Sequence, residues 1–216
     1  MTREDANPAR GLILGRIREI LGDGRDAAAE YAAIARPYRH EPSLDAAERV
    51  ELFADRLQHY QVGVYRCERA TLPRTVAETL SARGKATLVV PAGVPREWLP
   101  RTLGIIEDND LEYRELDRCE GVLTGCTVAI ASTGTIVLRH QQAEGRRALT
   151  LVPDYHLCVV FVDQIVQTVP EAIRELSSTG PALVTTISGP SATADIEMTR
   201  IRGVHGPRTL DVILAE

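Results

Sequence analysis

The sequence predicts an α/β fold with a mostly parallel sheet, preceded by a helical N-terminal extension. Between residues 62 and 116, short β-branched runs alternate with helical stretches, a texture typical of parallel strands joined by crossover helices. The strand-like runs are almost continuously apolar, as strands covered on both faces are. The chain of 216 residues is 44% hydrophobic and 25% charged, which is the composition of a folded globular protein.

The first quarter of the chain has helical periodicity throughout. Apolar residues recur at spacings of three and four from Leu12 to Leu21, before the break at Gly22-Asp23-Gly24, and a second apolar pattern runs from Leu44 to Leu57. We therefore expect residues 1–60 to form a helical arm and residues 61–216 to form the α/β domain.

The elements of the α/β domain follow from short apolar runs and their breakers. We expect a strand at 62–65, a helix at 72–83, a strand at 86–90, a strand at 104–106 and a helix at 111–116. Several strand-like runs then follow without helices between them, which predicts a meander of strands at 122–123, 126–131, 135–138, 149–152 and 157–162. A helix after Pro170, a buried strand at 182–187 and a last strand at 211–214 complete the domain.

Charge and composition exclude several classes of function. The net charge is −5, which does not suit binding to a phosphate backbone, so nucleic acid is not an expected partner. The first residues do not show the basic-then-apolar order of a secretory signal, and no apolar run approaches the roughly 18 to 20 residues of a membrane helix. We expect a cytoplasmic protein with reduced thiols and no membrane span.

Cysteine and histidine spacing gives no sign of a metal centre. The four cysteines stand at positions 67, 119, 126 and 158, with no CxxC pair. The five histidines, at positions 40, 59, 140, 156 and 205, show no metal-binding spacing. We therefore expect no metal and no cofactor in this chain.

The segment from Ser188 to Glu197 is the leading candidate for a binding site. It directly follows the strand expected at 182–187, and ligands of open α/β sheets bind beyond the carboxyl ends of strands. Gly189 allows the backbone to approach a ligand closely. Three hydroxyl groups can donate hydrogen bonds without bulk, those of Ser188, Ser191 and Thr193.

Two carboxylates, Asp195 and Glu197, end this segment and are candidates for proton transfer or for accepting a ligand hydroxyl. The same residues also suit an ordinary turn, with Ser191 or Thr193 as the N-cap of a short helix and the carboxylates near its N-terminus. Spacing alone leaves both interpretations open.

A second hydroxyl-rich turn is Thr133-Gly134-Thr135, between two strand-like runs. It has the composition of a hairpin bend with Gly134 at positive φ. Its threonines are also candidates to present hydroxyls to a pocket.

Two histidines are candidate site residues. His156 begins a strand that has a buried composition, and His205 lies between Gly203 and Gly206. A histidine held between glycines and near two carboxylates can act as an acid, a base or a ligand contact, or it can make a structural hydrogen bond.

From about Val62 to Leu214 the chain resembles the lactate utilization protein C group of the LUD-domain family. The resemblance rests on six blocks in order: Gly125 to Ala131, Thr133 to Leu138, Glu144 to Leu149, Pro153 to His156, Ser188 to Glu197, and Gly203 to Pro207. One departure is Ser132, where the family usually has a glutamate. The N-terminal quarter resembles the family less distinctly.

The resemblance implies a NagB/RpiA/CoA-transferase-like α/β fold and a part in oxidising lactate to pyruvate. It further implies two partner proteins that carry iron–sulfur clusters, and a small carboxylate or phosphorylated ligand for this chain. Two alternatives remain open at this point. One is a stand-alone isomerase or CoA-transferase-like enzyme with Asp195 or Glu197 as base, and the other is a binding module without catalysis that docks through its N-terminal helices.

Overall fold

The structure is a computed structural model that describes residues 8–21, 26–38, 42–178, 180, 183–193, 201–202 and 206–216. The chain divides into two compact units, Met1–Tyr38 and Arg39–Glu216. The first unit contains helices α1 (Pro8–Leu21) and α2 (Ala27–Ala33). Asp26 caps α2 by accepting hydrogen bonds from the backbone of Ala28 and Ala29, each 3.1 Å long. This unit is the helical extension that the sequence predicts.

Helix α3 (Ala46–His59) belongs to the second unit. It begins with a capping box between Asp45 and Glu48. Its apolar face is fully buried at Phe53 and Leu57, which are part of the main core. The unit boundary therefore lies near residue 38, whereas the sequence placed the end of the helical arm at residue 60.

The second unit is built on a six-stranded sheet in which every strand pair is parallel within the described residues. The strand order is β1-β12-β7-β4-β2-β3. The strands are β1 (Gly63–Cys67), β12 (Thr209–Ala215), β7 (Tyr155–Phe161), β4 (Val122–Thr124), β2 (Thr87–Pro91) and β3 (Gly104–Asp108). The α/β class and the parallel sheet predicted from the sequence are confirmed.

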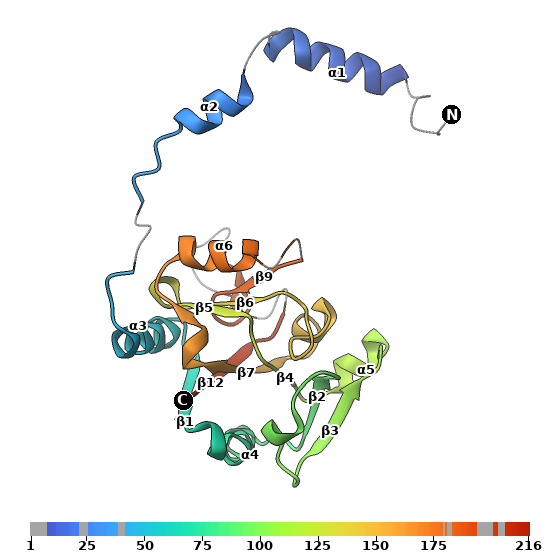
Figure 1. Ribbon diagram of the computed structural model, residues 1–216. Coiled ribbons are helices and arrows are strands. Elements are labelled where there is room, and N and C mark those ends of the chain that lie inside the picture. The colour runs from blue at the N-terminus through green and yellow to red at the C-terminus, as the bar shows by residue number, and fades with distance from the viewer. Residues whose placement is uncertain are drawn as a thin grey trace. The chain divides into compact units, whose positions relative to one another are not determined.

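Both faces of this sheet are covered (Figure 1). Helix α4 (Leu72–Ala82) packs on one face, where Val76 and Leu80 meet the alternate side chains of β2, β7 and β12. Helix α3 and a second sheet cover the opposite face, which presents Cys158, Val160 and Val212. Strands β7 and β12 are therefore almost completely buried.

The second sheet has the strand order β8-β5-β6-β9. Its strands are β5 (Val128–Ile130), β6 (Thr135–Leu138), β8 (Ile165–Val166) and β9 (Thr185–Ile187). Strands β5 and β6 form an antiparallel hairpin, β9 pairs antiparallel with β6, and β8 pairs parallel with β5. Helix α6 (Val169–Ser178) packs on the outer face of this sheet.

The remaining elements are short. They are α5 (Tyr113–Arg118), the strands β10 (Ala192–Thr193) and β11 (Ile201–Arg202), which pair antiparallel, and the 3-10 turns Arg69–Thr71, Arg96–Trp98, Ala131–Thr133, Arg147–Thr150 and Val162–Gln164.

Three expectations of local structure were wrong. The strands expected as a meander divide between the two sheets, because β4 and β7 pair in parallel while β5 and β6 leave to form the hairpin. Residues 149–152 do not form a strand, since Arg147–Thr150 is a 3-10 turn that buries Leu149. The strand expected at 182–187 is only Thr185–Ile187 among the described residues, and Leu183 is 83% exposed instead of buried.

A buried ion pair joins the last strand of the first sheet to the end of α4. Asp211 is fully buried, and the Arg83 guanidinium donates to both of its oxygens at 2.6 and 2.8 Å. The Tyr155 hydroxyl donates to the same carboxylate at 3.0 Å. Gly63 lies opposite Asp211 in strand β1, where any larger side chain would collide with the carboxylate. Because Asp211 is buried, its negative charge must be compensated by groups within the protein.

Replacing Asp211 with asparagine tests this ion pair. Asp211→Asn leaves Arg83 without its compensating charge, so we expect the free energy of unfolding to fall by about 2 kcal/mol. The loss is smaller than for a fully buried pair because the Arg83 side chain is 39% exposed. Urea denaturation measures it. The matched control is Glu51→Gln, which removes the exposed pair with Arg66 and should change stability little; equal effects of the two variants would contradict this account.

Candidate anion site

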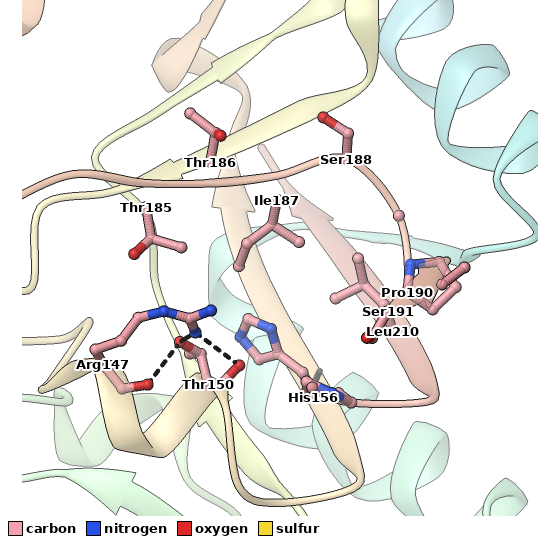
Figure 2. A pocket seen from close by; sticks show the side chains of 14 residues that line it. Arg147, Thr150, His156, Thr185, Thr186, Ile187, Ser188, Pro190, Ser191 and Leu210 are labelled. Carbon is pink, nitrogen blue, oxygen red and sulfur yellow. Dashed lines mark hydrogen bonds between the residues drawn. The ribbon is translucent and has the colours of Figure 1, made fainter. Parts of the chain in front are cut away.

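A cavity of about 230 Å³ lies where the amino ends of β7 and β12 meet the segment that leaves β9 (Figure 2). Its lining residues come from the turn before β7, from β7 and β12, and from the segment around β9: Arg147, Thr150, His156, Thr185, Thr186, Ile187, Ser188, Gly189, Pro190, Ser191, Ala192, Gly206, Pro207 and Leu210. The volume is below the range of about 300 to 1,000 Å³ for drug-sized ligands, so a small ligand fits it.

The location differs from the one expected at the carboxyl ends of parallel strands. His156 and Leu210 are the second residues of β7 and β12, so the cavity lies at the amino ends of these strands. The reason is topological. Strand β9 belongs to the second sheet, where it pairs antiparallel with β6, and the chain that leaves it crosses the opposite end of the first sheet.

The segment from Ser188 to Ser191 is held in place by its backbone. The Ser191 amide donates to the carbonyl of Pro207, just before β12, at 2.8 Å. Gly189 has φ of +86°, and a Cβ there would lie 2.7 Å from Cβ of Tyr60, at the end of α3. Only glycine fits both the left-handed backbone and this close approach. Gly189 therefore packs against α3 and also lines the cavity, and its contact with a ligand stays a prediction.

The two hydroxyl-rich segments of the sequence meet in the structure. The Thr133 and Thr135 hydroxyls are 2.8 Å apart, and the Thr135 hydroxyl is 2.8 Å from that of Ser188. Gly134 has φ of +61° and packs against Arg56 of α3. Ser188 is the member of this chain of hydroxyls that lines the cavity, whereas the turn at 133–135 lies behind it and does not.

His156 is a neutral imidazole at the inner wall. It is 1% exposed, and its Nε2 lies 2.8 Å from the Thr124 hydroxyl. Burial, together with the nearby positive charge of Arg147, lowers the pKa of His156 to about 4. Figure 2 shows the ring directed towards the space beneath Ile187. Within the described part of the chain, Nδ1 is the ring nitrogen available to a ligand.

Arg147 and Thr150 are site residues that the sequence analysis did not single out. The Arg147 guanidinium donates through Nη1 to the carbonyl and to the hydroxyl of Thr150, each at 3.1 Å, as Figure 2 shows. These residues begin and end the 3-10 turn Arg147–Thr150, and the strand expected at 149–152 would have included Thr150 alone of the two. The neighbouring Arg146 has a structural role instead, because it forms a bidentate ion pair with Asp108.

The charge of the cavity favours an anion. Among the described lining residues Arg147 is the one charged side chain, and the others are hydroxyl, apolar, glycine or neutral imidazole. A carboxylate bound there would have a cation and several hydrogen-bond donors around it.

Four predicted site residues fall wholly or partly outside the described part of the chain. Asp195, Glu197 and His205 lie outside the described residues. Thr193 is described only through its backbone, which pairs with Ile201. Their roles as acid, base or ligand contacts stay predictions.

The described residues contain no group of three or more His, Cys, Asp or Glu side chains placed to hold a metal ion. None of the described helices has the length and apolar character to cross a bilayer.

Comparison with known proteins places the chain in a family. A family model for the LUD domain matches residues 96–215. The chain belongs to the LUD domain family. Lactate utilization protein C of Deinococcus radiodurans is 45% identical to this LUD protein, and the match covers 82% of this chain and 84% of the relative. Lactate utilization protein C of Halalkalibacterium halodurans is 30% identical, covering 96% of this chain and 97% of the relative.

A solved structure supports the same assignment. The crystal structure of a DUF162 family protein from Deinococcus radiodurans matches this LUD protein with a TM-score of 0.71 and 41% identity. The match covers 81% of this chain and all of the other chain. The family predicted from the six sequence blocks is thereby confirmed.

The depressed pKa of His156 predicts a pH dependence of stability. The unfolded chain binds a proton at His156 below its ordinary pKa of about 6.5, but the folded chain does so only near pH 4. The stabilising contribution of the neutral ring is therefore fully present above pH 6.5 and is lost as pH falls towards 4. When the pH falls from 7 to 4.5, the free energy of unfolding should decrease in both proteins. We expect the decrease to be roughly 2 to 3 kcal/mol smaller for His156→Gln than for the wild type.

Urea denaturation at a series of pH values measures this difference. The exposed His59 provides the control, because His59→Gln should keep the wild-type pH dependence. Parallel curves for the wild type and His156→Gln would show that His156 is not held neutral by burial.

Proposed function

We propose that this protein takes part in lactate utilization by binding a small carboxylate at Arg147, within a system whose iron–sulfur clusters lie on partner proteins. Relatives from Deinococcus radiodurans and Halalkalibacterium halodurans, both called lactate utilization protein C, match most of the chain and support the role in lactate utilization. The observation that supports the carboxylate is the cavity of about 230 Å³ with Arg147 as its one charged lining residue in the described part of the chain.

The site favours a carboxylate over a phosphate group. One guanidinium compensates the single charge of a carboxylate, whereas a phosphate dianion would need further positive charge. The neutral state of His156 means that it contributes a hydrogen bond and no charge near pH 7. The hydroxyls of Thr150 and Thr185 add polar groups that suit a second oxygen of the ligand, such as that on C2 of lactate or pyruvate.

The cysteines support placing the clusters on other proteins. A [4Fe–4S] cluster takes four thiolates around one centre. Cys126 and Cys158 are buried in one core cluster, whereas Cys67 and Cys119 pack beside two other core clusters. A hydrogen bond with Cys158, together with burial, holds the pKa of Cys126 well above its ordinary value. These thiols suit packing better than ligation.

Arg147 should determine anion binding. With L-lactate or pyruvate as the ligand, we expect Arg147→Gln to weaken binding about 10- to 100-fold, because a charge-assisted hydrogen bond of roughly 1.5 to 3 kcal/mol is lost. Isothermal titration calorimetry measures the dissociation constants. Arg114→Gln, at an exposed arginine of α5, is the matched control and should bind as the wild type does.

The alternative outcomes separate the ligand classes. Equal binding by wild type and Arg147→Gln would remove Arg147 from the site. Tighter binding of inorganic phosphate than of lactate and pyruvate would replace the carboxylate with a phosphorylated ligand.

The part in lactate utilization has its own test. We expect extracts of host cells that lack this chain to lose lactate-dependent reduction of an electron-accepting dye, and purified wild-type protein to restore it. The Arg147→Gln protein should restore it poorly, whereas the Arg114→Gln protein should restore it fully. Undiminished lactate oxidation in extracts without the chain would reject the role.

A further inference from the structure

A second, larger hollow adjoins the candidate anion site. It is an open groove of about 1,070 Å³ that begins at the carboxyl ends of β2 and β3, where Pro91 and Asp108 end the strands. Ligands of open α/β sheets bind at this end of parallel strands. This groove therefore lies at the end of the sheet where the sequence predicts a site, although the described residues of the predicted site lie elsewhere.

The two hollows share a boundary. Arg147 and Thr185 line both of them, and Figure 2 shows the two side chains next to each other on one side of the smaller cavity. The His140 ring fixes this boundary, with Nε2 2.8 Å from the Thr185 hydroxyl and Nδ1 2.9 Å from the carbonyl of Gly145. A ligand bound to the Arg147 guanidinium can thus extend from the cavity into the groove.

The backbone around the groove takes costly conformations. His140 has φ of +57° and Asp110 has φ of +64°, in the left-handed region that residues other than glycine rarely adopt. Gly93 leaves room for the turn at Gln142, because a Cβ atom on residue 93 would lie 2.6 Å from the backbone of Gln142. Such strain collects at binding sites, where the fold holds the backbone against its own preference.

The wall of the groove beyond Thr185 is apolar and exposed to solvent. Leu183 is 83% exposed and Val184 is 45% exposed, and both line the groove with Pro91 and Ala92. Exposure of these apolar side chains to water is unfavourable, so a ligand group that covers them would gain binding free energy.

The far end of the groove holds charges that are already paired. Arg146 lines the groove and binds Asp108 at 2.8 Å, which lowers the pKa of Asp108 and keeps it charged. The exposed Asp110 has the same guanidinium at 3.5 Å. A second carboxylate on the ligand would compete with these two acids for Arg146, so the groove favours an uncharged extension along Leu183 and Val184.

We propose that the groove binds the apolar side chain of a monocarboxylic acid whose head group is held at Arg147. The ligand class is then 2-hydroxy and 2-oxo acids with side chains longer than the methyl group of lactate. This proposal rests on the proposed carboxylate site, and it adds that the site accepts larger acids than lactate and binds them more tightly.

A chain-length series tests this proposal on the full-length protein by isothermal titration calorimetry. The probes are L-lactate, 2-hydroxybutyrate, 2-hydroxyhexanoate and 2-hydroxyadipate. Each added methylene that becomes buried should tighten binding about threefold, so 2-hydroxyhexanoate should bind at least tenfold more tightly than lactate. The dicarboxylate 2-hydroxyadipate should lose this gain, because its second carboxylate would leave water for an apolar wall while the nearby Arg146 is already paired with Asp108 and Asp110.

Two variants locate the binding of the side chain. Leu183→Asp should bring the ratio of the 2-hydroxyhexanoate and lactate affinities close to one. Ile173→Asp is the matched control, since Ile173 is a 56% exposed residue of α6 outside the groove, and it should keep the wild-type ratio.

The outcomes distinguish the two proposals. Lactate binding that depends on Arg147, with no gain for 2-hydroxyhexanoate, would overturn the groove proposal and leave the carboxylate site intact. A gain that persists in Leu183→Asp would also overturn it. Binding of no acid in the series, or binding that Arg147→Gln does not weaken, would overturn both.

Discussion

Strands β7 and β12 are buried on both faces, and this burial determines which polar groups the centre of the protein can hold. Side chains of these strands meet α4 on one side and the second sheet with α3 on the other. A polar group there must be satisfied within the protein. Asp211 meets this demand with Arg83 and Tyr155, and His156 meets it by staying neutral beside Thr124. The same burial places an uncharged imidazole in the wall of a cavity whose charge comes from Arg147 at its edge.

The sequence predicted the first sheet well because its strands are buried and its helices are amphipathic. Near-continuous apolar runs identified β2, β7 and β12, and the pattern from residue 72 onwards identified α4. It did not predict how the strands divide between two sheets. Apolar patterning shows that a strand is buried but not which neighbour it pairs with, and the pairing of β4 with β7 spans the whole β5–β6 hairpin.

The candidate site could be predicted in part. Hydroxyl-rich segments mark Ser188 and Ser191 locally, and both residues line the cavity, as His156 does; their contact with a ligand stays a prediction. Arg147 could not be found in this way, because nothing local separates it from Arg146, and only the fold directs one arginine to Asp108 and the other to the cavity. Gly134 and Gly189 each allow another part of the protein to pack closely against the backbone, and in both cases that part is helix α3.

A crystal structure of the protein grown or soaked with 2-hydroxyhexanoate would show directly whether Arg147 holds the ligand. We expect a carboxylate at the Arg147 guanidinium, an oxygen of the ligand within hydrogen-bond distance of His156 Nδ1, and the alkyl chain along Leu183 and Val184. A cavity filled by the protein's own side chains, or a ligand bound away from Arg147, would contradict this expectation.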